Sequence, residues 1–311
     1  MNFKNRRPLL KGLLSIAATG FLLSACYPPM SALQKNTADR LAAPVFMHER
    51  HINTEDFTLT AFERVRKEGG VANIYIEGNG GIITPLSKDD LNLKLNRSFT
   101  PQNPVALHLS TFDNTSNVIY LARPCQYVPS HSIHSVKQCK GQENAPRIYS
   151  ETAIKSMNDA LSEIKSRYGF TGFNLIGVGG GGAVAVILTA QRDDILSLRT
   201  VSGHLNLTPL HKGEDKSDMA GALNPLDYAP LISQVPQHHF IGDHDKMLTP
   251  EVYMSYLEAS APRKCLRFSI VEDASHDKGM VNAWPNMMEL PVDCMRTETP
   301  GTIIINKVEK L

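Results

Sequence analysis

The sequence predicts an α/β fold in which a mostly parallel central sheet is flanked by helices. The first observation behind this prediction is the stretch 173–185, an apolar run of strand length that breaks into glycines and continues as small helix-forming residues. The second is the alternation of strand-like and helix-like segments along the chain, which is typical of parallel sheets. At 311 residues and 42% hydrophobic content the chain can bury one sizeable core, and we expect a single domain over residues 51–311 with a small cap or none.

The expected strands are short runs of apolar or β-branched residues bounded by turn residues. They cover residues 57–62, 73–77, 118–122, 173–176, 198–202, 238–241 and 266–271. Between 202 and 238 a long polar excursion, residues 203–226, is expected to be a solvated loop, with a flap over a site as the alternative.

The expected helices carry recognisable start and stop signals. Ser150 is a suitable N-cap, Gly169 a suitable stop, and the apolar residues between them share one helical face. A buried helix follows the glycines as far as about residue 192, and Thr249 with Pro250 opens another. Residues 104–109 are expected to open a short helix.

The N-terminus has the features of an export signal. Four positive residues precede a short apolar stretch over 13–22, and Leu23-Ser24-Ala25-Cys26 follows. This resembles a bacterial lipobox, which implies that residues 1–25 are a signal peptide and that Cys26 is acylated and held in a lipid bilayer. Tyr27 in place of Asp after the cysteine implies the outer membrane. A signal-anchor helix is the alternative, but the apolar run is short for a membrane span. Residues 26–50 are expected to be a tether.

Charge and composition argue against a nucleic-acid partner. The formal net charge is +1, and Lys and Arg are scattered among Asp and Glu instead of forming a basic patch. No internal repeat is evident.

The cysteines apart from Cys26 are even in number, which in an exported chain suggests disulfides. They allow three pairings, and the choice that is local in sequence joins Cys125 to Cys139 and Cys265 to Cys294. A zinc site is the alternative, because His131 and His134 lie between the first two cysteines. Their spacing fits no compact zinc knuckle, so no metal is expected.

Three loops at expected strand ends follow in an informative order. They are the glycine turn after residue 176, the segment 242–250 with Asp245, and the loop with His276. From about residue 55 to 290 the chain resembles the α/β-hydrolase superfamily, whose nucleophile, acid and base follow in this order on loops after strands. The resemblance assigns the first oxyanion-hole loop to residues 75–80, so Asn79, Gly80 and the N–H of Gly180 would form that hole.

The chain departs from this family at the nucleophile. The family turn is G-x-S-x-G, and here residues 177–181 place Gly179 where the serine belongs. Without a hydroxyl oxygen no acyl-enzyme can form, so Gly179, Asp245 and His276 are expected to be a vestigial triad in a catalytically impaired protein. The serine position has a positive φ, which glycine adopts freely.

Several alternatives remain. Ser202 could be another nucleophile in an active ester or amide hydrolase, Asp243 or Asp273 could face His276, and Asp245 could simply cap the next helix. The protein could bind a small ester, acid or peptide ligand, or be purely structural. The glycine run also satisfies G-x-G-x-x-G, but the next strand ends without the acidic residue that holds a ribose, so no dinucleotide or other cofactor is expected.

Overall fold

The computed structural model describes residues 30–79, 100–128, 132, 139, 149–210, 221–276, 278–295 and 305–308. Cys26, Gly80, His131 and His134, which the sequence singled out, lie outside the described residues. The membrane anchor, one proposed oxyanion-hole residue and the histidines of the zinc alternative therefore stay predictions.

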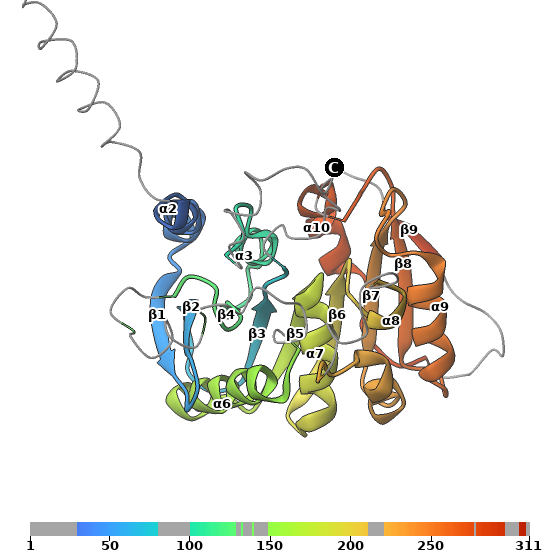
Figure 1. Cartoon of the computed structure of the whole chain (residues 1–311), viewed down its shortest axis with the longest axis horizontal. Helices are drawn as coiled ribbons and strands as arrows, with labels where there is room; N and C mark the ends of the chain where they lie inside the picture. Colours follow the sequence, from blue (N-terminus) through green and yellow to red (C-terminus); the bar gives the residue numbers. More distant parts are fainter. Residues whose placement is uncertain are drawn as a thin grey trace, which may run out of the picture.

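Within the described residues, a nine-stranded sheet forms the centre of the molecule, with the order β1-β2-β4-β3-β5-β6-β7-β8-β9. β2 is antiparallel to both of its neighbours, and every other neighbouring pair is parallel. The prediction of a mostly parallel sheet flanked by helices is confirmed (Figure 1). The strands are β1 His48–Asn53, β2 Thr58–Val65, β3 Val71–Ile76, β4 Asn117–Leu121, β5 Gly172–Val178, β6 Ile195–Val201, β7 Gln237–Gly242, β8 Leu266–Val271 and β9 Ile305–Val308.

Helices cover the sheet on both faces. Residues of α6, α7 and α9 belong to one buried hydrophobic cluster, and residues of α2, α3 and α10 belong to a second. The bounds are α2 Met30–Ala42, α3 Val105–Thr111, α6 Glu151–Tyr168, α7 Gly180–Gln191, α8 Leu207–Leu210, α9 Pro250–Ala259 and α10 Met280–Glu289, with 3-10 turns η1 Ala43–Val45 and η3 Pro225–Ile232.

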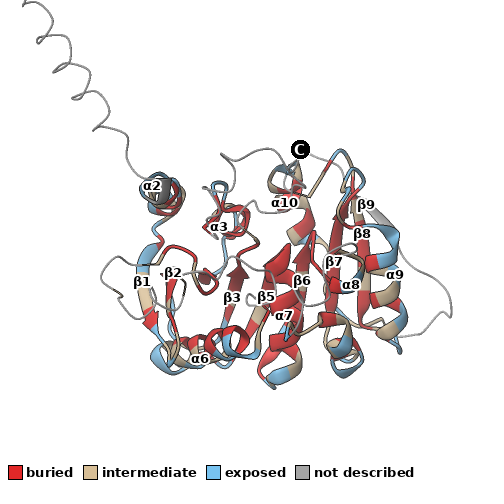
Figure 2. Cartoon of the chain, viewed as in Figure 1, coloured by how far each residue is buried: buried red, intermediate tan, exposed pale blue. Residues whose placement is uncertain are grey.

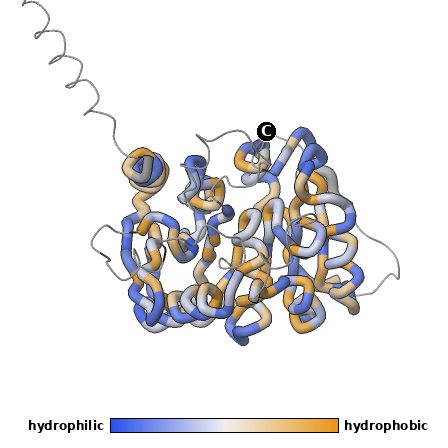
Figure 3. The backbone as a smooth tube through the Cα atoms, in the orientation of Figure 1, coloured by the Kyte–Doolittle hydropathy of each residue, from blue (hydrophilic) through white to orange (hydrophobic). Residues whose placement is uncertain are grey.

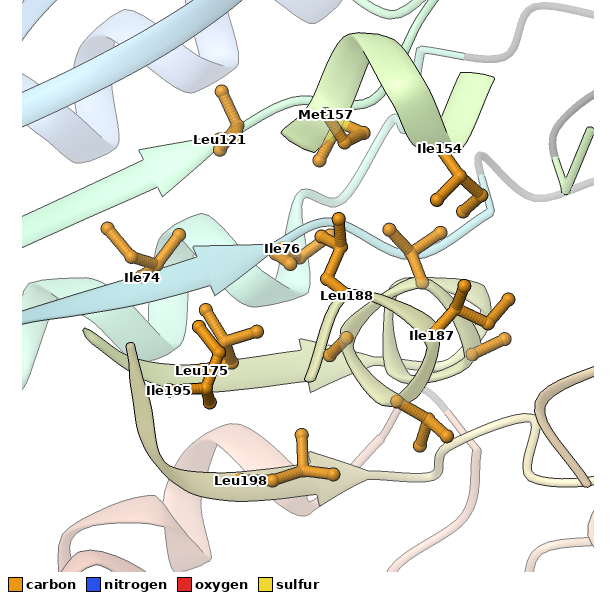
Figure 4. Packing of buried hydrophobic residues seen from close by; sticks show 14 of the residues in the cluster. Ile74, Ile76, Leu121, Ile154, Met157, Leu175, Ile187, Leu188, Ile195 and Leu198 are labelled. Carbon is orange, nitrogen blue, oxygen red and sulfur yellow. The ribbon is translucent and has the colours of Figure 1, made fainter. Parts of the chain in front are cut away.

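The strand residues alternate between the two clusters, as a pleated strand requires. Ile74 and Ile76 of β3 pack with α6 and α7, whereas Tyr75 between them packs with α3 and α10. Figure 4 shows the first cluster, where Leu188 of α7 lies near Ile76 of β3, and Leu175 of β5 lies near Ile195 of β6. The central strands are buried (Figure 2), while edge strand β1 is mostly hydrophilic (Figure 3).

Helix α7 starts directly after β5 and is buried along nearly its whole length, from Gly180 to Thr189. A helix that is apolar on all sides must lie inside the protein, and α7 packs against β5, β6 and η3. The outer helix α6 is amphipathic instead. Its N-cap Ser150 accepts a 3.3 Å hydrogen bond from the Ala153 N–H, and its C-cap Gly169 has φ 65°.

Residues 26–50 are not all tether, which corrects the expected division of the chain. Met30–Ala42 forms α2, whose Ala38 and Ala42 are buried against the second cluster, and β1 starts at His48. Gln34 Nε2 donates to the Thr100 carbonyl at 2.7 Å. The weak hydrophobic periodicity concealed this helix, because small alanines make its buried face. Among the helices of the described ranges, none has the length and hydropathy to cross a membrane.

Both disulfides are present with the sequence-local pairing. Cys125 is bonded to Cys139, and Cys265 to Cys294. In the described part of the chain no group of three His, Cys, Asp or Glu side chains is placed to hold a metal ion.

Candidate functional site

Gly179 forms the turn between β5 and α7 and has φ 50° and ψ −119°. This backbone conformation is strained for a residue with a side chain and free for glycine. The Gly179 N–H donates to Val201 O at 2.9 Å, and the Gly182 N–H donates to Gly179 O at 2.9 Å. A sharp strand–turn–helix is the local geometry of a nucleophile elbow.

The other glycines of the run are required by close packing. A Cβ on Gly177 would meet the backbone of Gly181, and one on Gly181 would meet the backbone at Ile76. A Cβ on Gly180 would meet the Asn79 amide oxygen and would lie 2.5 Å from the Tyr149 hydroxyl. The space beside Gly180 is therefore filled by these two side chains.

The environment of Gly179 differs, because the nearest atom to its Cβ position is a histidine nitrogen. His276 Nε2 lies 3.3 Å from that position, and His204 Nε2 lies 3.8 Å from it. Both imidazoles thus approach the point from which a serine side chain would extend.

His276 and Asp245 form a hydrogen-bonded pair in the loops after β8 and β7. His276 Nδ1 lies 3.0 Å from Asp245 Oδ2, and the Asp245 side chain is fully buried. The other oxygen, Oδ1, accepts the N–H groups of Met247 at 2.9 Å and Leu248 at 3.0 Å. Burial acts to raise the Asp245 pKa, but the interaction with His276 and these N–H groups outweigh it, and the pKa is lowered.

Asp243, the alternative partner for His276, makes different contacts from Asp245. Asp243 Oδ1 accepts the Ala274 N–H at 3.2 Å and lies 3.2 Å from His244 Nδ1. The helix-capping alternative for Asp245 coexists with its contact to His276, because the two carboxylate oxygens serve different partners.

His204 is a member of the site that sequence reasoning did not find. It lies in the loop after β6 and is 1% exposed. Its backbone N–H donates to Gly179 O at 3.0 Å. Its ring centroid is 5.3 Å from that of His276, and its Nδ1 is 3.1 Å from the Tyr149 hydroxyl. The available signal was its place at the carboxyl end of a strand, where parallel sheets gather site residues.

Arg123 was also missed, and it fixes the loop that follows β3. It is 1% exposed, and its Nη2 donates to Gly78 O at 2.9 Å and to the Asn79 amide oxygen. Gln126 Nε2 donates to the same Gly78 carbonyl at 2.8 Å. Asn79 Nδ2 lies 3.4 Å from the Tyr149 hydroxyl. The loop assigned to the oxyanion hole is thus held next to Gly180 by a buried cation.

Glu77 precedes this loop and is itself buried. Its Oε1 accepts the Gly78 N–H at 2.8 Å. Burial raises the pKa of Glu77 to about 7, because the charged form loses its hydration. The same effect lowers the pKa of Arg123.

Ser202 does not share a hydrogen bond with these histidines within the described residues. It is fully buried with φ 48°, its N–H donates to Phe240 O at 2.9 Å, and its Oγ has no hydrogen-bond partner there.

A shallow cleft of about 610 Å³ lies at the other end of α7, lined by residues 190–193 and Asn158. It is remote from the histidines and carries none of this chemistry.

Solved structures with similar folds include esterases, a phospholipase and a peptidase. An acylaminoacyl peptidase of Pyrococcus horikoshii matches with TM-score 0.56 and 11% identity over 82% of this chain and 43% of that one. A membrane phospholipase A, described as a bacterial virulence factor, matches with TM-score 0.51 and 14% identity over 86% and 92%. An esterase of Pyrococcus furiosus matches with TM-score 0.50 and 13% identity over 79% and 89%.

The chain has the α/β-hydrolase fold. No protein-family model matches the sequence, and no curated protein matches it. In this α/β-hydrolase fold, the loops after β3, β5, β7 and β8 carry Asn79, Gly179, Asp245 and His276, and the loop after β6 adds His204. His276 and His204 lie beside Gly179, Asp245 contacts His276, and Asn79 lies beside Gly180, whereas Gly80 lies outside the described residues.

Proposed function

We propose that this chain is a membrane-anchored lipoprotein of serine-hydrolase ancestry that has lost acyl-enzyme chemistry and binds an ester, acid or peptide ligand at the former active site. One observation carries the proposal. The Cβ position of Gly179 lies 3.3 Å from His276 Nε2, and His276 Nδ1 is hydrogen-bonded to Asp245. The histidine and the carboxylate that orients it therefore lie beside an elbow without a hydroxyl.

The missing atom prevents the first chemical step. In a serine hydrolase the hydroxyl oxygen gives its proton to the histidine and attacks the substrate carbonyl. Gly179 offers neither the proton nor the oxygen, so the His276–Asp245 pair has no hydroxyl to activate at this turn. Binding needs only hydrogen-bond donors and shape, and those survive the loss of a nucleophile.

The polar groups around Gly179 suit a ligand with acceptor oxygens. Asn79 and Tyr149 border Gly180, and buried Arg123 stands behind Asn79. Buried donors that lie close to a positive charge favour a carbonyl or carboxylate group. This supports an ester, an acid or a peptide terminus as the ligand class.

The chemistry can be tested with a fluorophosphonate probe, which labels activated serines. We expect no labelling of the natural protein and labelling of Gly179→Ser, with slow hydrolysis of an activated ester. Gly179→Ala controls for the backbone change, and Gly179→Ser/His276→Ala should not label. A folded Gly179→Ser protein that neither labels nor hydrolyses would refute the elbow assignment. Labelling of the natural protein that Ser202→Ala removes would instead establish an active hydrolase.

The anchor is tested separately. Cells fed an alkynyl palmitate should label the natural chain and not Cys26→Ser, and the labelled protein should fractionate with the outer membrane. Intact-mass measurement should show the chain beginning at Cys26 with acyl groups. An unlabelled chain that retains residues 1–25 would support the signal-anchor alternative.

A further inference from the structure

Gly179 differs from the other glycines of its run in the room beside its backbone. The described atoms nearest to its Cβ position are His276 Nε2 at 3.3 Å, His204 Nε2 at 3.8 Å and Gly78 Cα at 3.9 Å. For residues 177 and 180–182, a described atom lies 2.8 Å or less from the same position. The turn can therefore accept a small atom beside Gly179 without any shift of the surrounding chain.

The atoms that face this position are polar and suit a water molecule. A bound water takes about two to four polar partners. His276 Nε2 and His204 Nε2 approach the position from two sides, and the centroids of the two rings are 5.3 Å apart. A water oxygen within hydrogen-bond distance of His276 Nε2 would lie close to where the serine hydroxyl of the fold stands.

His276 is oriented as a base toward this position. Its Nδ1 lies 3.0 Å from Asp245 Oδ2. The pKa of Asp245 is lowered, so its carboxylate is ionised and only accepts hydrogen bonds. The proton of the neutral imidazole therefore stays on Nδ1, and Nε2 offers its lone pair toward Gly179. This arrangement does not depend on a serine.

The histidine is reachable from solvent, whereas the groups that orient it are not. The His276 side chain is 24% exposed, and the Asp245 side chain is 0% exposed. On the other side of the turn, His204 is 1% exposed and its Nδ1 lies 3.1 Å from the Tyr149 hydroxyl. Water and a small ester can thus reach a base whose position is fixed by buried hydrogen bonds.

We propose that this site hydrolyses small esters in one step, with a water molecule beside Gly179 in place of the serine hydroxyl. His276 Nε2 takes a proton from the water while the water oxygen forms a bond to the carbonyl carbon of the ester. The tetrahedral intermediate then collapses, the bond from that carbon to the alkoxy oxygen breaks, and the proton on His276 passes to the leaving alcohol. Acid and alcohol are released, the imidazole is neutral again, and no acyl-enzyme forms.

This inference rests on the proposed function for its ligand class, an ester held at the former active site, and it adds an activity to that site. A positioned base contributes roughly 10²- to 10⁴-fold to a rate. Serine proteases that lack a triad member keep roughly 10³- to 10⁴-fold catalysis over water. The expected activity is therefore slow but measurable.

Hydrolysis of phenyl acetate by the full natural chain tests the reaction. This ester is chosen because a more activated one can acylate a histidine nitrogen directly. We expect kcat to exceed the rate constant in buffer by roughly 10²- to 10⁴-fold. Phenol should appear without a burst, and mass measurement during turnover should find no acetylated protein. The rate should fall in deuterium oxide, because a proton moves in the slow step.

Two variants address the water and its base separately. In Gly179→Ala the new methyl group would lie 3.3 Å from His276 Nε2, so it occupies the water position without supplying a hydroxyl. Gly179→Ala and His276→Ala should each lower the rate by roughly 10²-fold or more. His244→Ala is the matched control and should keep the natural rate, because the His244 side chain is 66% exposed. Circular dichroism checks the fold, and His276→Ala decides the test if Gly179→Ala does not fold.

Several outcomes overturn the inference. They are hydrolysis no faster than in buffer, a rate that His276→Ala or folded Gly179→Ala leaves unchanged, and an acetylated residue found during turnover. The fluorophosphonate probe separates this failure from that of the proposed function. A natural protein that the probe labels carries a reactive serine, and both proposals then fail. A protein that is neither labelled nor active on phenyl acetate removes only the one-step hydrolysis and leaves the binding site standing.

Discussion

His276 Nε2 lies 3.3 Å from the position that a Cβ atom on Gly179 would occupy. A serine hydroxyl one bond further out would be within hydrogen-bond reach of that nitrogen after a small rotation, which is the contact that nucleophile activation requires. One side chain at position 179 thus separates this arrangement from the geometry of a catalytic triad, because His276 already contacts the buried Asp245 side chain.

Introducing a side chain at Gly179 should cost stability. We expect Gly179→Ala to lower the free energy of unfolding by about 1–3 kcal/mol, because φ 50° with ψ −119° strains any residue with a Cβ. Urea denaturation measures the change. Gly70→Ala is the comparison. Gly70 also has a positive φ, 70°, but no atom lies within 4 Å of its Cβ position, so this variant measures the cost of an ordinary left-handed backbone without contacts. An unchanged midpoint for Gly179→Ala would show that the turn relaxes without cost.

In the Gly179→Ser background, Asp245 becomes testable as a positioning residue. Asp245→Asn should reduce any restored ester hydrolysis by roughly 10³- to 10⁴-fold, because the amide favours the wrong imidazole tautomer. The readout is kcat with its pH profile, while KM should change little. Asp243→Asn is the matched control and should retain activity, since Asp243 Oδ1 accepts the Ala274 N–H. Equal losses in both variants would argue against the pairing with His276.

A side chain at Gly180 should destabilise the protein for a steric reason. Gly180→Ala places a methyl group against Asn79 and 2.5 Å from the Tyr149 hydroxyl, and we expect a loss of about 1–3 kcal/mol in the free energy of unfolding. The double variant Gly180→Ala/Tyr149→Phe should recover part of it. Additive losses in this double-mutant cycle would show that Tyr149 is not the obstacle.

Glu77 should make the protein less stable as pH rises. Its folded pKa is about 7 against 4.5 for the ordinary carboxyl, so the unfolded chain releases this proton first. The free energy of unfolding should fall between these values by about 3 kcal/mol and then level off. Glu77→Gln stays neutral and should lack this component. Urea denaturation at pH 5 and pH 8 tests it, and an identical pH dependence in both proteins would exclude Glu77 as its source.

The disulfide between Cys265 and Cys294 should stabilise the C-terminal part of the sheet. It closes 29 residues of chain, and its removal in Cys265→Ser/Cys294→Ser should lower the free energy of unfolding by about 3–4 kcal/mol in the loop-entropy model. Thermal unfolding with and without reductant provides the comparison. Reductant should shift the natural protein further than this variant, which keeps only the Cys125–Cys139 bond; equal shifts would contradict the expected contribution.

Much of the fold was readable because local patterns agreed with the tertiary structure. The apolar runs of β3 to β8 and the capped helix α6 are strong local signals, and they were predicted close to their observed bounds. α2, β1 and α10 were not predicted, since small, polar or mixed residues form them and only their docking makes them stable.

The sequence by itself determined the order of the loops and the glycine at the serine position, because chain order and residue identity need no coordinates. Only the tertiary structure decided that His204 and Arg123 belong to the site and that Asn79 and Tyr149 fill the space beside Gly180. Those contacts join loops from different strands, such as Arg123 with Asn79 and His204 with Tyr149, and no local pattern records which distant side chains meet when parallel strands align their carboxyl ends.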